Sequence, residues 1–222
     1  LDQQSLSKSG LSNLSGIEKH QELTQLDISS TPIVLLNGVD SLYQLKTLNA
    51  SATPISDLTP LSGLMELQEI HISSSQVKSI KSLAGLPKLS LIRAEKCGLH
   101  QDSVWQLLNE KPGVTVVFRS QKLQNWWNSL NSSWQKALYD QMEGDPEKTE
   151  DLHRFTAKKK LQFTGTWRLS SLHSLEPMFA LEELDMPSMG IRSLKGIEKL
   201  KHLKILNLSR NPIQDLSPLD QL

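Results

Sequence analysis

A 22-residue period is the feature that most constrains the fold of this chain. Four segments begin with a leucine that is followed three positions later by a second apolar residue, and then by a third two positions further on. These segments begin at Leu23, Leu45, Leu67 and Leu203. A fixed period in the twenties indicates structural units that stack on one another in one dimension. The period therefore predicts a solenoid.

Each unit is expected to begin with a short β-strand. In the first of these segments Leu26 and Ile28 flank Asp27, so the two apolar side chains point into the core and the aspartate points out. Pro32 follows and ends the strand, because proline has a fixed φ and forces extended geometry on the residue before it. We predict one parallel sheet with strands centred near Leu26, Leu48, Ile70, Ile92, Val116, Leu184 and Leu206.

The apolar positions after each turn recur in steps of three residues. This spacing favours tight helical turns over long helices on the convex side of the solenoid. One unit cannot bury its own apolar face, so the repeat leucines and isoleucines are expected to form one continuous core between stacked units. The last segment, Asp215–Leu222, is a convex half-unit without a following strand, and we expect the native protein to continue beyond it.

The period is broken between about residues 99 and 160. A helix over 101–108, with Asp102 or Ser103 as its N-cap, and a strand over 114–118 are predicted to close a first array. Apolar residues at helical spacing then predict three helices, the second capped near Asn131 and the third begun by Asp145 or Thr149. We predict a first array over residues 1–118, a Trp-rich helical insert over 119–160 and a second array over 161–222.

Three of the five tryptophans lie in the predicted insert, at Trp126, Trp127 and Trp134. Such side chains bury a large apolar area, so we expect them to attach the insert to a neighbouring array. The alternative is that they form an exposed aromatic binding patch.

The charges of the chain balance, with 24 basic and 24 acidic residues. A neutral chain gives no general reason to expect a nucleic acid or an anionic membrane as partner. No apolar run approaches the roughly 18 residues that a membrane span requires. Cys97 is the single cysteine, so an intramolecular disulfide is impossible. Because Cys97 shares its repeat position with Thr31 and Thr53, we predict a buried structural thiol at the turn.

The leucine pattern, the Thr-Pro-Ile and Asn-Pro-Ile turns and the segments Asp57–Leu61 and Asp215–Leu219 resemble bacterial leucine-rich repeats of the internalin type. The resemblance covers about two-thirds of the chain, roughly residues 1–98 and 164–222. It implies an α/β leucine-rich-repeat solenoid, with a parallel sheet on the concave face and short helical turns on the convex face. It also implies a concave sheet that binds a protein, and a location in the cell envelope or outside the cell rather than in the cytoplasm.

The outward strand positions of the first array form the candidate binding surface. They are short, polar and of mixed charge, with neither an aromatic stacking platform nor a basic stripe, which argues against sugars and nucleic acids. Such side chains suit a contact with another protein, and the alternative is that this sheet is only solvated. The candidate partner-binding residues are Gln25, Asp27, Thr47, Asn49, Glu69, His71, Arg93 and Glu95.

Catalytic and metal-binding motifs are absent from the sequence. The six histidines lack H-x-x-x-H spacing, and no Walker loop, G-x-S-x-G segment or cysteine pair occurs. We therefore predict no catalytic residues, no metal site and no cofactor. The leading function is a non-catalytic protein–protein interaction module. The alternatives are a structural spacer of a longer repeat protein, or an accessory part of an enzyme whose catalytic domain lies outside this chain. The oligomeric state is left open.

Overall fold

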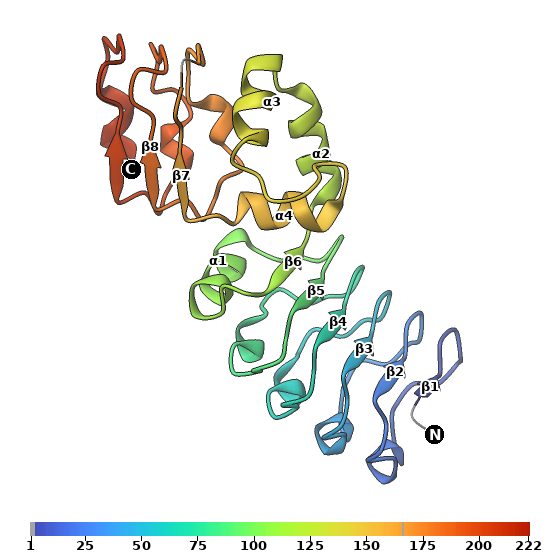
Figure 1. Ribbon diagram of the computed structural model, residues 1–222. Coiled ribbons are helices and arrows are strands. Elements are labelled where there is room, and N and C mark those ends of the chain that lie inside the picture. The colour runs from blue at the N-terminus through green and yellow to red at the C-terminus, as the bar shows by residue number, and fades with distance from the viewer. Residues whose placement is uncertain (1–2, 166) are drawn as a thin grey trace. The chain divides into compact units, whose positions relative to one another are not determined.

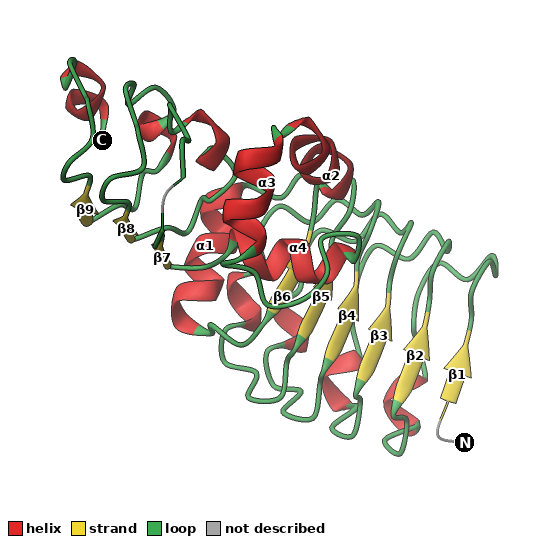
Figure 2. Ribbon diagram, turned by 45° about the horizontal axis from the view of Figure 1, so that its top comes forward, coloured by secondary structure: helices red, strands yellow, loops and turns green. Residues whose placement is uncertain are grey.

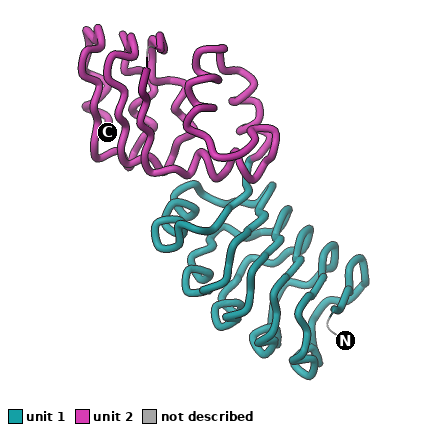
Figure 3. Tube along the Cα trace, viewed as in Figure 1, with its two compact units in different colours: residues 1–119 teal, residues 120–222 magenta. Residues whose placement is uncertain are grey.

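The computed structural model describes residues 3–165 and 167–222. The chain forms two compact units, Leu1–Arg119 and Ser120–Leu222 (Figure 3). Within the described residues, one parallel sheet of six strands lies in the first unit and one of three strands lies in the second (Figures 1 and 2). The prediction of a single sheet is therefore wrong, because three helices separate the sixth strand from the seventh along the chain.

In the first unit the strands follow one another in chain order. From the first strand to the fifth, each residue pairs with the residue 22 positions further along the chain. The predicted centres at Leu26, Leu48, Ile70, Ile92 and Val116 are confirmed, whereas the first strand was not predicted. The strands are β1 (Gln3–Ser5), β2 (Gln25–Asp27), β3 (Thr47–Asn49), β4 (Glu69–His71), β5 (Leu91–Arg93) and β6 (Thr115–Val117).

The side of the first unit opposite the sheet consists of single 3₁₀ turns and one α-helix, as the three-residue steps predict. The turns are η1 (Ile17–Lys19), η2 (Val39–Ser41), η3 (Thr59–Leu61) and η4 (Lys81–Leu83). The helix, α1 (Gln101–Glu110), has His100 as its N-cap, so the predicted caps Asp102 and Ser103 are wrong. Ser103 lies within the first turn, and its Oγ accepts a hydrogen bond from the Ile80 amide of the preceding coil (3.4 Å).

Each strand leaves the sheet through a residue with left-handed backbone geometry, such as Ser30 (φ 57°) and Ala52 (φ 56°). This turn directs the next side chain back onto the strand. The Thr31 hydroxyl donates to the Ile28 carbonyl oxygen (2.7 Å), and the thiol of Cys97 donates to the carbonyl oxygen of Ile72 in the preceding coil (2.8 Å). The predicted role of Cys97 is confirmed, but the side chain is partly exposed rather than buried.

The second unit begins with three α-helices and continues as stacked coils. Strand β7 pairs with β8 at an offset of 23 residues and β8 with β9 at 22, so the coils regain the period after one extra residue. The predicted centres at Leu184 and Leu206 are confirmed, and β7 was not predicted. The elements are α2 (Ser120–Ser129), α3 (Ser132–Tyr139), α4 (Thr149–Thr156), β7 (Lys160–Gln162), η5 (His173–Leu175), β8 (Glu183–Asp185), η6 (Ile197–Lys199), β9 (Ile205–Asn207) and η7 (Ser217–Gln221).

The helices α2–α4 pack on the coils of the second unit through their tryptophans, as predicted. Trp134 is 1% exposed, and its Nε1 donates to the Leu169 carbonyl oxygen (3.0 Å). The Trp126 Nε1 donates to the Ser174 carbonyl oxygen (3.0 Å). Asn131 caps α3 by accepting a hydrogen bond from the Trp134 amide (3.0 Å), which confirms the predicted cap. The helices and the coils therefore share one hydrophobic core.

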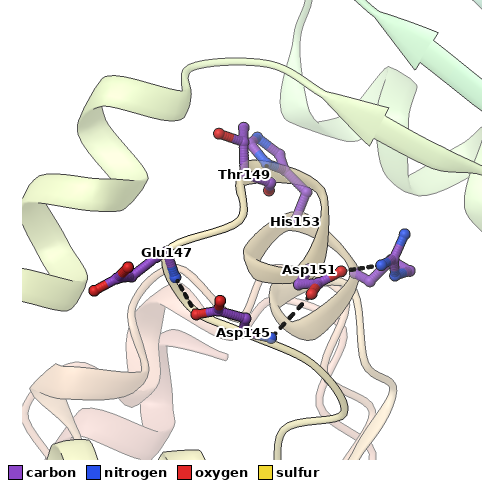
Figure 4. Close-up of polar contacts among 6 residues, drawn as sticks. Asp145, Glu147, Thr149, Asp151 and His153 are labelled. Atoms are coloured by element: carbon purple, nitrogen blue, oxygen red, sulfur yellow. Dashed lines mark hydrogen bonds and ion pairs between the residues drawn. The ribbon is translucent and has the colours of Figure 1, made fainter.

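The segment between α3 and α4 is held by a buried carboxylate (Figure 4). Asp151, which is 8% exposed, accepts hydrogen bonds from the Asp145 amide (2.9 Å) and from the Arg154 guanidinium. Gly144 has a φ of +123°, and a Cβ there would lie 2.5 Å from Asp151 Oδ2, so no other residue fits without displacing the carboxylate. Asp145 thus belongs to this turn. Helix α4 begins at Thr149, which is one of the two predicted starts.

Some repeat leucines are less buried than the pattern predicts. Leu11 is 43% exposed and Leu216 is 62% exposed. Both lie in the outermost described coils of their sheets, where a coil has a neighbour on one side only. None of the helices in the described part of the chain is long and apolar enough to cross a membrane.

Replacing Leu48 by aspartate tests the predicted register. Leu48 has no exposed surface, so Leu48→Asp leaves a carboxylate without a partner in the core. We expect a loss of about 3 kcal/mol or more in the free energy of unfolding, measured by urea denaturation. Asn49→Asp is the matched control, because it places the same group one residue further along β3 on the outward face. Equal stability of the two variants would contradict the register.

Replacing Trp134 by alanine tests the packing of the helices. Trp134→Ala removes a buried ring that lies edge-on to Phe163, with 6.1 Å between the ring centroids. We expect a loss of about 3–5 kcal/mol in the free energy of unfolding, as for other large aromatic truncations. Tyr139→Ala on the same helix removes a side chain of a residue that is 56% exposed and should change stability little. A native state in which acrylamide fully quenches Trp134 fluorescence would refute the packing.

Candidate protein-binding surface

The strand register brings four predicted site residues into one row. Asp27 pairs with Asn49, Asn49 with His71 and His71 with Arg93, on the adjacent strands β2–β5 (Figure 1). Neighbouring strands lie about 4.8 Å apart, so the side chains are spaced at that interval. We refer to Asp27, Asn49, His71 and Arg93 as the concave row.

The other four predicted residues flank the concave row. Gln25, Thr47 and Glu69 pair across β2–β4 in a second row, two residues before the first along each strand. Glu95 follows the end of β5, where its backbone amide donates to the Ser73 hydroxyl (3.2 Å). The structure therefore brings all eight predicted residues to one face of the first sheet.

Two members of the concave row are held by their own coils. The Ser29 amide donates to Asp27 Oδ1 (2.9 Å), and the Ser51 amide donates to Asn49 Oδ1 (3.1 Å). In each case a short side chain accepts from the amide two residues further on, which limits its rotamers. Asp27 and Asn49 are partly exposed, so they are accessible and already oriented.

His71 forms a polar pair with its strand neighbour. The His71 Nε2 lies 3.5 Å from Glu69 Oε2, and the two side chains are 29% and 45% exposed. The pair offers a partner an imidazole beside a carboxylate. Together with the acidic Asp27 and the basic Arg93, it makes the surface mixed in charge, as the sequence predicts.

The candidate surface extends one coil further than the eight predicted residues, to β1. Gln3 and Ser5 of β1 pair with Gln25 and Asp27, and they continue both rows. The hydroxyls of Ser7 and Ser29, two residues beyond the ends of β1 and β2, lie 3.0 Å apart. The centre of β1 is Gln4, a polar residue where the other strands have leucine, isoleucine or valine, so the leucine pattern does not reveal it. The 22-residue spacing back from Leu26 is the signal that does.

On the corresponding face of the second sheet, side chains of adjacent strands are hydrogen-bonded to one another. Asp185 on β8 accepts hydrogen bonds from Gln162 Nε2 on β7 (3.2 Å) and from Asn207 Nδ2 on β9 (2.8 Å). Lys160 Nζ also lies 2.8 Å from Glu183 Oε1. A partner that used these side chains would have to compete with bonds that they already form with each other.

Glu182 lies before β8 between two lysines from adjacent coils. Its carboxylate oxygens lie 2.6 Å from Lys204 Nζ and 3.0 Å from Lys159 Nζ. The hydrogen bonds from Lys204, and then those from Lys159, lower the pKa of Glu182 below its ordinary value of 4.5. This carboxylate joins three successive coils of the second unit.

Over the described ranges, 3–165 and 167–222, no group of three or more His, Cys, Asp or Glu side chains is arranged to hold a metal ion. The predicted absence of catalytic residues remains a prediction.

Comparison with known proteins identifies the repeat. A family model for leucine-rich repeats, in two copies, matches residues 180–221. No curated protein matches the sequence. This match and the stacked coils of both units confirm the predicted leucine-rich-repeat fold.

Two internalins and another leucine-rich-repeat protein are among the solved structures similar to this chain. Internalin C2 of Listeria monocytogenes is 17% identical, with a TM-score of 0.49 over 98% of this chain and 75% of that chain. A second internalin of the same organism is 15% identical, with a TM-score of 0.36 over 100% of this chain and 84% of that chain. A leucine-rich-repeat protein of Leptospira interrogans is 19% identical, with a TM-score of 0.45 over 98% of this chain and 51% of that chain.

The lowered pKa of Glu182 predicts a pH dependence. A carboxylate with a lowered pKa in the folded state stabilises the protein above its unfolded-state pKa, and it loses that effect as the pH falls through the folded-state value. At neutral pH, the wild-type protein should therefore unfold at a higher urea concentration than the Glu182→Gln variant. The difference should shrink as the pH falls below Glu182's ordinary pKa of 4.5. It should also shrink in about 1 M salt, where the screening length is about 3 Å. If the difference in urea midpoint depended on neither pH nor salt, it would not arise from the ion pairs of Glu182.

Proposed function

We propose that this chain is a non-catalytic protein–protein interaction module whose partner binds the concave row of the first sheet. Leucine-rich repeats commonly mediate contacts between proteins, and this sheet presents its side chains at the regular spacing of parallel strands. The observation that carries the proposal is the orientation of Asp27 and Asn49 by hydrogen bonds within their own coils.

Pre-orientation matters because binding must offset the entropy of every side chain that it immobilises. A flexible side chain costs roughly 0.5–1.5 kcal/mol when an interface orders it. Short side chains on rigid strands, already bonded to their own backbone, avoid part of that cost. The second sheet is a poorer candidate, since Asp185 is already hydrogen-bonded to both neighbouring strands.

The mixed charge of the concave row also supports a protein as partner. Asp27 and Arg93 lie at its two ends, with Asn49 and His71 between them. Charges of both signs on one surface fix the register of a partner and disfavour a uniformly charged polymer. The proposed location, in the cell envelope or outside the cell, rests on the resemblance of the repeats to those of internalins.

A double substitution on two adjacent strands tests the proposal. Once a partner has been identified by pull-down with the intact protein, Asn49→Arg together with His71→Glu should weaken its binding at least tenfold, or about 1.4 kcal/mol. Both side chains are partly exposed, so the variant should still fold, with the thermal unfolding midpoint lowered only by loss of the bond from the Ser51 amide to Asn49. Isothermal titration calorimetry measures the affinity, and circular dichroism checks the fold.

Lys199→Glu is the control, because Lys199 is exposed in η6 and lies outside both strand faces. It should leave the affinity unchanged. If the double variant bound as well as wild type while Lys199→Glu abolished binding, the concave row would not be the binding surface. If no substitution on either face changed which proteins are recovered in the pull-down, a spacer role would be indicated instead.

A further inference from the structure

The second coil of the first unit exposes two apolar side chains on the segment between its strand and its 3₁₀ turn. Val34 is 50% exposed and Leu35 is 58% exposed. Both follow Ile33, which is fully buried. In five other coils the same two positions hold polar residues: Ser12–Asn13, Ser56–Asp57, Lys78–Ser79, Arg192–Ser193 and Gln214–Asp215. The apolar pair is therefore a departure from the repeat.

The departure removes a hydrogen bond that the other coils make. In those coils the second residue of the pair accepts from the backbone amide two positions further on. The acceptors are Asn13 (3.0 Å), Asp57 (2.8 Å), Ser79 (3.4 Å), Ser193 (3.2 Å) and Asp215 (2.9 Å). Leu35 has no acceptor to offer to the amide of Asn37. This coil thus lacks a local stabilising bond and has exposed apolar surface in its place.

The apolar pair borders a groove across the first three coils. One hollow of about 360 Å³ is lined by Val34, Leu35 and the first coil, and a second of about 580 Å³ continues over the third coil to Pro60. The two hollows meet at Asn37 and Gly38, which line both. We refer to the two together as the convex groove.

The charged residues that line the convex groove are all acidic. Glu18 lines the first hollow, and Asp40 and Asp57 line the second, whereas neither lining includes a lysine, arginine or histidine. Hydrogen bonds from the Thr59 side chain and backbone lower the pKa of Asp57 below its ordinary value. The groove thus combines an apolar wall with carboxylates.

We propose that the convex groove binds a segment of another protein that carries apolar side chains flanked by lysine or arginine. The apolar side chains would cover Val34 and Leu35, and the basic ones would pair with Glu18, Asp40 and Asp57. This surface is independent of the concave row. The chain would then hold two proteins at once, one on each face of its first unit.

The sharpest test replaces the apolar pair with the pair that the next coil uses. Val34→Ser together with Leu35→Asp reproduces Ser56–Asp57 and supplies the missing acceptor for the Asn37 amide. The melting temperature of this variant should equal or exceed that of wild type. A loss of binding could then not be ascribed to misfolding.

The probe is a phage-displayed library of random peptides, selected on the intact wild-type protein and counter-selected on the double variant. Selected peptides are synthesised with a fluorescent label, and their affinities are measured by anisotropy. We expect enrichment of peptides that combine apolar residues with lysine or arginine, and at least a tenfold weaker affinity for the double variant. Asp40→Asn should also weaken binding and reduce its dependence on salt.

A matched variant distinguishes binding to the groove from non-specific binding to any exposed apolar pair. Adding Lys78→Val and Ser79→Leu to the double variant moves the apolar pair to the fourth coil and leaves the three carboxylates in place. It should not restore binding. The proposal is overturned if it does, if the selected peptides are acidic or uncharged, or if none distinguishes wild type from the double variant. It is also overturned if wild type sediments as a dimer and the double variant as a monomer, because the occupant is then a second copy.

Discussion

The fold depends on the fact that a coil with a three-residue strand cannot bury its own apolar face. Leu48 and Ile70 lose all their exposed surface only because another coil lies on each side. That stacking requires coils of nearly equal length, and the offset between adjacent strands, which is 22 residues for most pairs, 23 for β7–β8 and 24 for β5–β6, sets the strand register. The concave row is a consequence of the same requirement, since Asn49 and His71 are adjacent for the reason that Leu48 and Ile70 are.

The strand-exit turns show that one structural role can be filled by different chemistry. The Thr31 hydroxyl returns to the carbonyl oxygen of Ile28 in its own coil, whereas the Cys97 thiol reaches Ile72 in the preceding coil. Asn211 does both, because its amide donates to Leu208 O of its own coil and to Met186 O of the preceding one. A buried carbonyl oxygen that loses its hydrogen-bond donor costs free energy, and donation to such an oxygen is what Thr31, Cys97 and Asn211 have in common.

Local patterns in the sequence predict most strand centres and the helices, whereas contacts between distant segments could not be predicted. Six of the seven predicted strand centres follow from the 22-residue spacing, and Val116 follows from its own apolar run. Strand β1 has Gln4 at its centre and is found only by counting back 22 residues from Leu26. Helical spacing predicted that Trp134 is buried, since burial depends on one face of α3. Its hydrogen bond to Leu169, 35 residues away, depends on how the helices pack on the coils, which no local pattern encodes. All eight predicted site residues came together because they follow the strand period.

One type of bond, from a backbone amide to a short side chain two residues earlier, relates the two faces of the first unit. On the concave side it holds Asp27 and Asn49 in place, so a rigid polar surface is obtained at little entropic cost. On the convex side the coils make it at Asn13 and Asp57, and the coil between them replaces the acceptor with Leu35. Exposing a leucine there stabilises nothing within the coil, since Leu35 is more than half exposed and the amide loses its acceptor. Contact with another molecule would recover the free energy that this coil forgoes, because it would remove the exposed apolar surface from water.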